Sequence, residues 1–140
     1  MILEYPFRFW SEGGVVYAQG LEPLDNVLTF GEDDTSARAA AREALSGVLA
    51  AMLDRGDTIP APPTEAPPGT HPIEPEPRTA WPALMRLERE RAHMTQVELA
   101  RRLGVSFQAV QKWERPSANP TLATMDRVLR ALGRRLALVD

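Results

Sequence analysis

Residues 3–9 alternate between two sets of positions, one apolar and one mostly polar. Alternation with a period of two is typical of a half-buried strand. The apolar face of this strand holds Leu3, Tyr5, Phe7 and Phe9. Pro6 lies on the other face and has no amide donor, so it favours an edge strand or a bulge. A turn at Glu12-Gly13-Gly14 and a second strand over residues 15–19 complete a predicted hairpin.

A third strand and one long helix follow this hairpin. Residues 27–30 predict the short strand, and the helix is expected from about Thr35 to Arg55, with Gly56 ending it. Alanines raise its helix propensity, and its apolar stripe has helical spacing. The stripe consists of Ala41, Leu45, Val48, Leu49 and Met52.

Nine of the thirteen prolines lie between residues 60 and 82. Proline fixes the backbone and favours extended, stiff conformations. We therefore predict a domain at residues 1–59, a proline-rich linker at 60–79 and a second domain at 80–140. A proline-rich ligand for another protein domain is the alternative interpretation of the linker.

Residues 95–114 predict two short helices joined by a tight turn. Thr95 and Glu98 form a capping box at the start of the first helix. Gly104 ends it, and Ser106 is a good N-cap for a second helix from Phe107 to about residue 114. The helical period turns Val110 and Trp113 inward, and Ala100 allows the two helices to cross closely.

The outer side chains of this helix pair suit DNA. Glutamine can pair with adenine through two hydrogen bonds, and lysine can bind guanine or a phosphate. A phenylalanine at the helix start can touch a thymine methyl group, and a glutamine at the preceding helix start can bridge to a phosphate. The ordinary alternative is a set of solvated side chains on a surface helix. The predicted DNA-binding residues are Gln96, Ser106, Phe107, Gln108, Gln111 and Lys112.

Residues 84–133 resemble the Xre/Cro/phage-repressor class of helix-turn-helix domains. The matching pieces include Met94-Thr95-Gln96, Leu103-Gly104-Val105-Ser106, Lys112-Trp113-Glu114 and Asn119-Pro120-Thr121-Leu122. The resemblance implies an all-α domain of about five helices. It also implies that Gln96, Phe107, Gln108 and Lys112 occupy DNA-facing positions, with Gln111 adjacent. Pro116 stands where members often have glycine, so the following loop is expected to differ in shape.

The charge of the chain is divided. The whole chain has a net charge of −3, but residues 1–63 hold four arginines and ten acids, and residues 78–140 hold twelve basic and six acidic residues. The basic part suits phosphate, whereas the acidic part would repel nucleic acid and attract a basic protein. The plainer interpretation is that an acidic surface only aids solubility.

The composition of the chain narrows the possible classes of protein and of binding site. The chain has no cysteine and two distant histidines, His71 and His93, so we expect no disulfide, no metal site and no cofactor. No apolar run approaches the roughly 20 residues that cross a bilayer, and the N-terminus does not resemble a signal peptide. We expect a soluble cytoplasmic protein that contacts no membrane.

The N-terminal block resembles the HicB antitoxin family. The matching residues are Tyr5-Pro6, Gly13-Gly14 with Val16-Tyr17-Ala18, Gly31, the run from Ala40 to Leu45, and the run from Gly56 to Pro60. The resemblance implies an α+β domain with a small antiparallel sheet and one long helix, an incomplete RNase H-like fold. That family often has a fourth strand after the helix, for which His71–Glu74 is the candidate.

This resemblance implies an antitoxin of a type II toxin-antitoxin system. Its N-terminal domain would neutralise a small, basic, HicA-type mRNA-cleaving toxin, and its C-terminal domain would bind operator DNA to repress its own operon. A homodimer or higher even oligomer is expected. The alternative function is a one-component transcriptional regulator with a ligand-sensing N-terminal domain.

The predicted N-terminal domain is not expected to be catalytic. The RNase H fold is catalytic elsewhere, but metal-dependent nucleases need converging carboxylates. Glu4, Asp25 and the run from Glu32 to Asp34 lie apart or in loops, so we expect no enzyme.

Residues 134–139 alternate weakly between apolar and polar positions, and two alternatives stay open. They could form a strand that pairs across a two-fold axis, or a tail that packs locally.

Overall fold

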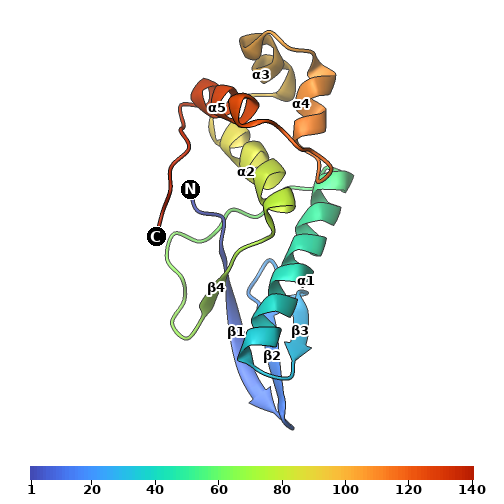
Figure 1. The fold of residues 1–140 in the computed structure, drawn as a ribbon, viewed down its shortest axis with the longest axis vertical. Helices are drawn as coiled ribbons and strands as arrows, with labels where there is room; N and C mark the ends of the chain where they lie inside the picture. The colour runs from blue at the N-terminus through green and yellow to red at the C-terminus, as the bar shows by residue number, and fades with distance from the viewer.

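The computed structural model describes all residues from 1 to 140 and contains one four-stranded antiparallel sheet and five helices (Figure 1). The chain forms first an α+β part and then a group of helices, as predicted. The strands are β1 (Tyr5–Glu12), β2 (Val15–Gly20), β3 (Leu28–Gly31) and β4 (His71–Ile73). The helices are α1 (Asp34–Arg55), α2 (Pro77–Arg91), α3 (Gln96–Leu103), α4 (Phe107–Trp113) and α5 (Leu122–Ala131).

The predicted hairpin of β1 and β2 is confirmed. Glu12 pairs with Val15, so the turn between them has two residues. These are Gly13 and Gly14, with φ angles of 59° and 77°. Two consecutive positive φ angles are the requirement of a type I′ turn, whose twist matches that of the two strands.

The prediction that Pro6 marks an edge strand or a bulge is wrong. The strand order is β3-β2-β1-β4, so β1 lies inside the sheet. Pro6 is directly opposite Pro72 of β4, and the pairing of β1 with β2 begins only at Phe7. Because antiparallel pairs alternate between hydrogen-bonded and non-hydrogen-bonded positions, two facing prolines fit a non-hydrogen-bonded position without losing a bond. The short strand anticipated at His71–Glu74 is confirmed as β4.

Helix α1 covers one face of the sheet (Figure 1). Asp33 caps its first turn in a capping box with Ser36, and Gly56 ends it in the left-handed conformation. Val48 and Met52 of the predicted stripe are only partly buried, because the most buried row runs at a spacing of four residues. That row consists of Ala37, Ala41, Leu45, Leu49 and Leu53.

The proline-rich segment runs back along the sheet and α1. The Tyr5 hydroxyl donates a hydrogen bond of 2.7 Å to the carbonyl oxygen of Pro60, and the Glu76 amide donates one of 2.8 Å to the Ser46 hydroxyl. Ile73 of β4 is buried in the first hydrophobic core. Composition alone predicted a spacer, but this segment also completes the sheet.

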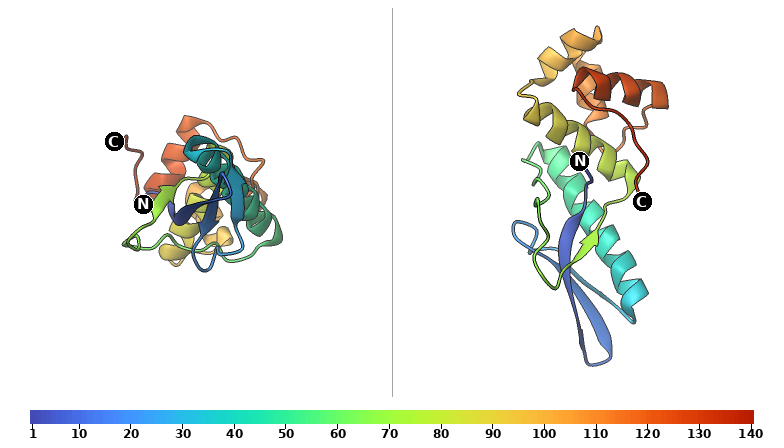
Figure 2. Two further views of the ribbon diagram at one scale, coloured as in Figure 1. Left: turned by 90° about the horizontal axis from the view of Figure 1, so that it is seen from below. Right: turned by 90° about the vertical axis from the view of Figure 1, so that its left-hand side faces the viewer.

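Helix α2 belongs to both hydrophobic cores. Ala83 and Leu87 pack with the sheet and α1, whereas Met85 packs in the second core with α3, α4 and α5. Figures 1 and 2 show an elongated molecule with the sheet at one end, α3 to α5 at the other and α2 between them. The two parts of the chain therefore meet through a shared helix.

The C-terminal part has four helices, α2 to α5, where about five were expected. Residues 134–140 form no regular secondary structure, and Arg134 donates a hydrogen bond of 2.6 Å to Glu88 of α2. All seven of these residues are exposed, and the tail ends near the N-terminus (Figure 2), so this chain shows neither of the two alternatives, a paired strand or a packed tail. None of the five helices has the length and apolar character that a membrane span needs.

Candidate nucleic-acid interface

The turn between α3 and α4 has the local geometry that the sequence predicts. The Thr95 hydroxyl accepts a hydrogen bond of 3.1 Å from the Glu98 amide, and Glu98 accepts one of 3.0 Å from the Thr95 amide. Gly104 ends α3 with a φ of 67°, and the Ser106 hydroxyl accepts a bond of 3.1 Å from the Ala109 amide. These caps satisfy amides that a helix terminus leaves free, so each short helix begins at a defined residue.

The inner faces of these helices meet in the second core. Leu99 and Val110 are fully buried, and Ala100 is 3% exposed at the crossing. Trp113 packs against the same core from a half-buried position. The inward orientation predicted for Val110 and Trp113 is confirmed, and the packing fixes the angle at which α4 is presented.

The predicted DNA-binding residues of α4 lie mostly on the outside. Phe107, Gln108 and Lys112 are exposed, and Gln111 is half-buried. The Ser106 side chain is occupied as the helix cap, so its role in the structure is to orient the first turn of α4. A helix that begins with exposed aromatic and amide side chains has the form that enters the major groove in helix-turn-helix complexes.

Gln96 is joined to a buried carboxylate. Its side-chain nitrogen donates a hydrogen bond of 3.2 Å to Glu114, which has no exposed surface. Glu114 also accepts two short bonds from Arg89, of 2.6 Å and 2.8 Å, and one of 3.4 Å from Arg86. Arg89 continues to the carbonyl oxygen of Met94 at 2.7 Å. The start of α3 is therefore held to the end of α4 by a buried charged network.

Electrostatics favour the ion pair in this network. Burial disfavours the charged form of Arg89, but the hydrogen bonds and charge of Glu114, with Glu90 as a smaller contribution, raise the pKa of Arg89 above its usual value. No role for Glu114 follows from the sequence motif alone. Its signal was its position four residues after Val110, which places both on the inner face of α4.

The end of α1 borders the same surface. A cavity of about 230 Å³ lies between the two parts of the chain. One wall is Leu53–Gly56, at the end of α1, and the other wall is formed by Arg86, Gln96, Gln111 and Arg115. Arg86 of α2 joins the two parts of the chain, because it donates hydrogen bonds to the main-chain carbonyl oxygens of Leu53 and Asp57 at 3.2 Å and 3.1 Å. The N-terminal part therefore holds a set position beside the candidate DNA-binding surface.

Residues 85–139 match the Helix-turn-helix family model. The match begins within α2 and covers less than half of the chain, so it describes the C-terminal part. This part is a helix-turn-helix of Xre/Cro type, and α4 is its second helix. A helix-turn-helix of this kind supports a DNA-binding regulator. The chain as a whole matches no curated protein.

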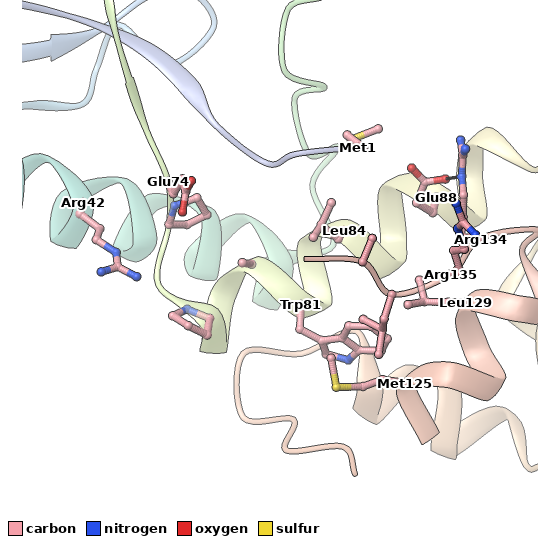
Figure 3. Close-up of a pocket in the computed structure, with 15 residues that line it drawn as sticks. Met1, Arg42, Glu74, Trp81, Leu84, Glu88, Met125, Leu129, Arg134 and Arg135 are labelled. Atoms are coloured by element: carbon pink, nitrogen blue, oxygen red, sulfur yellow. Dashed lines mark hydrogen bonds and ion pairs between the residues drawn. The ribbon is translucent and has the colours of Figure 1, made fainter. Parts of the chain in front are cut away.

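A second cavity lies on the other side of α2, near both termini. Its volume is about 420 Å³, and its walls include Trp81, Leu84, Met125, Leu129 and the tail from Arg134 to Ala137 (Figure 3). Two buried polar atoms beside it, Trp81 Nε1 and Glu88 Oε1, have no hydrogen-bond partner. No group of three or more His, Cys, Asp or Glu side chains is placed to hold a metal ion.

Proposed function

We propose that this chain is an antitoxin that also represses its own operon. Its N-terminal part, residues 1–59, binds and neutralises a small, basic, HicA-type mRNA-cleaving toxin, and its helix-turn-helix binds operator DNA. It acts by binding and catalyses no reaction. The observation that carries the proposal is the charge division, in which an acidic sheet and helix are joined to a basic helix-turn-helix through α2.

Each half of the proposal has its physical support. The acidic part attracts a basic protein and repels DNA, so it leaves operator binding to the other end of the molecule. The exposed Phe107, Gln108 and Lys112 offer one contact each for a methyl group, a base edge and a phosphate. A dimer or higher even oligomer presents α4 to both halves of a palindromic operator.

The test uses the full chain and the product of the gene beside its own, which the proposal expects to be a small basic protein. That protein alone should stop growth of the host, and co-expression of this chain should restore growth. The purified complex should retard DNA from the promoter of the pair. Normal growth with the neighbouring protein alone, or failure of the two proteins to bind, would remove the antitoxin function and leave the DNA-binding regulator.

A ligand-sensing regulator is the second candidate, and the cavity beside Trp81 favours it. A volume of about 420 Å³ lies within the range of small-molecule pockets, and Arg42 and Arg135 lie among the residues that line it. This candidate predicts that a small apolar carboxylic acid raises the melting temperature of the full chain and changes its affinity for operator DNA. A melting temperature unmoved by a panel of such acids would argue against it.

A further inference from the structure

The sheet has a face that α1 does not cover. Residues opposite one another in the register share a face, so the outward side chains follow from the pairs Arg8–Gln19, Trp10–Tyr17 and Tyr17–Phe30. We call this surface the open face. It comprises Arg8, Trp10, Tyr17, Gln19, Leu28 and Phe30.

Aromatic rings form a row across the open face. Trp10 stacks on Tyr17 with ring centroids 5.4 Å apart, and Tyr17 lies 6.2 Å from Phe30. Phe30 is 63% exposed, Leu28 is 56% exposed and Trp10 is 39% exposed. Single exposed apolar residues need no explanation, but adjacent ones on three neighbouring strands form a patch of the kind that marks interaction sites.

The patch has a defined boundary. Near the start of β1, Pro6 is buried and shares a small cavity with Leu21, Pro23 and Pro63 of the neighbouring segments. From Arg8 onward these segments leave the face open. The proline-rich segment therefore covers one end of the sheet and stops before the aromatic row.

The charges around the open face select the partner. Residues 1–33, which form β1 to β3 and the loops between them, contain one cation, Arg8, and six acids. The acids are Glu4, Glu12, Glu22, Asp25, Glu32 and Asp33. Such a potential repels nucleic acid, and two copies meeting by this face would bring like charges together. An apolar centre with an acidic rim fits a basic protein surface that carries its own apolar residues.

We propose that the open face is the docking surface for a basic protein, with Leu28 and Phe30 as its anchors. The inference rests on the antitoxin function for the identity of that protein and adds where it binds. It places the partner at the end of the molecule opposite α3 and α4. The helix-turn-helix then stays free for DNA in the complex.

The experiment measures affinity between the full chain and the small basic protein encoded beside it. The test variant is Leu28→Thr with Phe30→Thr, because threonine keeps a high strand propensity and both side chains are exposed. The matched control is Leu122→Thr on α5, where the leucine is 74% exposed. We expect the double variant to lose at least about tenfold in affinity and the control to bind as the unchanged chain does.

Charge-reversal variants test the acidic residues around the open face. Glu32→Lys should weaken binding of the same partner, whereas Glu65→Lys in the proline-rich segment should not. A second readout is hydrogen exchange of the full chain, in which the partner should protect β2 and β3. This readout does not depend on the variants being folded.

The outcomes separate the two proposals. If the unchanged chain binds the partner and both Leu28→Thr/Phe30→Thr and the exchange pattern leave the open face uninvolved, the docking surface is wrong and the antitoxin function stands. If the unchanged chain does not bind that protein, both fall. Binding of a fluorescein-labelled single-stranded RNA that needs Phe30, or a dimer that the double variant dissociates, would also overturn the proposal.

Discussion

The Arg86 guanidinium of α2 donates a hydrogen bond of 3.2 Å to the main-chain carbonyl oxygen of Leu53, in the last turn of α1. The last carbonyl groups of a helix have no partner within it and carry the negative end of its dipole, so a cation is favoured there. Arg86 also reaches Glu114 at 3.4 Å. One side chain thus joins the end of the N-terminal helix to the charged network of the helix-turn-helix.

This junction predicts that the whole chain unfolds in one transition. Leu49→Ala, which truncates a fully buried side chain of the first core, should cost about 2–5 kcal/mol. Because α2 supplies residues to both cores, the loss should appear equally at both ends of the molecule. Urea unfolding followed by hydrogen exchange of β1 and of α3 measures this. Separate midpoints, with only β1 affected, would mean two independent domains.

Glu114→Gln should be strongly destabilising. The substitution keeps the shape but removes the charge that compensates Arg86 and Arg89, and breaking a buried ion pair costs about 3–5 kcal/mol. Thermal unfolding measures the loss. Glu43→Gln on the exposed side of α1 is the control and should change stability by less than about 0.5 kcal/mol. Equal melting temperatures of the two variants would contradict a structural role for the network.

Gln108→Ala should weaken binding to operator DNA more than binding to unrelated DNA. An exposed glutamine in the first turn of α4 is placed to contact a base edge, and a good two-bond contact contributes about 1–3 kcal/mol of discrimination. Mobility shifts on both DNAs at fixed salt measure the ratio. Lys112→Ala provides a comparison, and a loss for either variant that is equal on both DNAs would indicate phosphate contact alone.

Gly31→Ala and Gly47→Ala should have opposite effects. A Cβ atom at Gly31 would collide with the main-chain nitrogen of Ala37 and with Ser36, because the end of β3 passes close to the first turn of α1. Gly47 has open space around it within α1, where alanine is favoured by up to about 1 kcal/mol. We therefore expect a lower melting temperature for Gly31→Ala and a higher one for Gly47→Ala. A rise for both would show that the strand end does not pack as described.

The cap at Asp33 predicts a loss of stability in acid. Hydrogen bonds from the Ser36 amide and hydroxyl lower the pKa of the Asp33 carboxyl below its usual value. The charged cap therefore contributes stability above about pH 4, and this contribution is lost as pH falls through the lower pKa of the folded state. Urea midpoints of the unchanged chain and of Asp33→Asn should converge once the pH lies below the pKa of Asp33 in the folded state. A constant difference at every pH would exclude a contribution from the charge.

Much of the helix-turn-helix was predictable because its signals are local. The capping box of Thr95 and Glu98, the helix stop at Gly104 and the N-cap at Ser106 each involve residues within a few positions of one another. The Gly13-Gly14 turn is local in the same sense, since only its two φ angles decide the hairpin. The exposed positions of Gln108 and Lys112 follow from the helical period once α4 is placed.

The interpretation of Pro6 failed for the opposite reason. A lone proline favours an edge strand, and nothing near it in sequence indicates a partner that also lacks an amide. Pro72 lies far along the chain, yet it is directly opposite Pro6 in the sheet. The role of Gln96 shows the same limit, because its hydrogen-bond partner Glu114 belongs to the next helix.

The sequence by itself determined the hairpin, the long helix, the caps and turn of the helix-turn-helix and the division of charge, because each depends on neighbouring residues or on composition. The tertiary structure alone decided that β4 pairs with β1, which places β1 inside the sheet, that α2 belongs to two cores, and that Glu114 is buried between two arginines. It also decided that Trp10, Tyr17 and Phe30 form one row on an open face. These features depend on contacts between residues distant in sequence, which local propensity and periodicity do not encode.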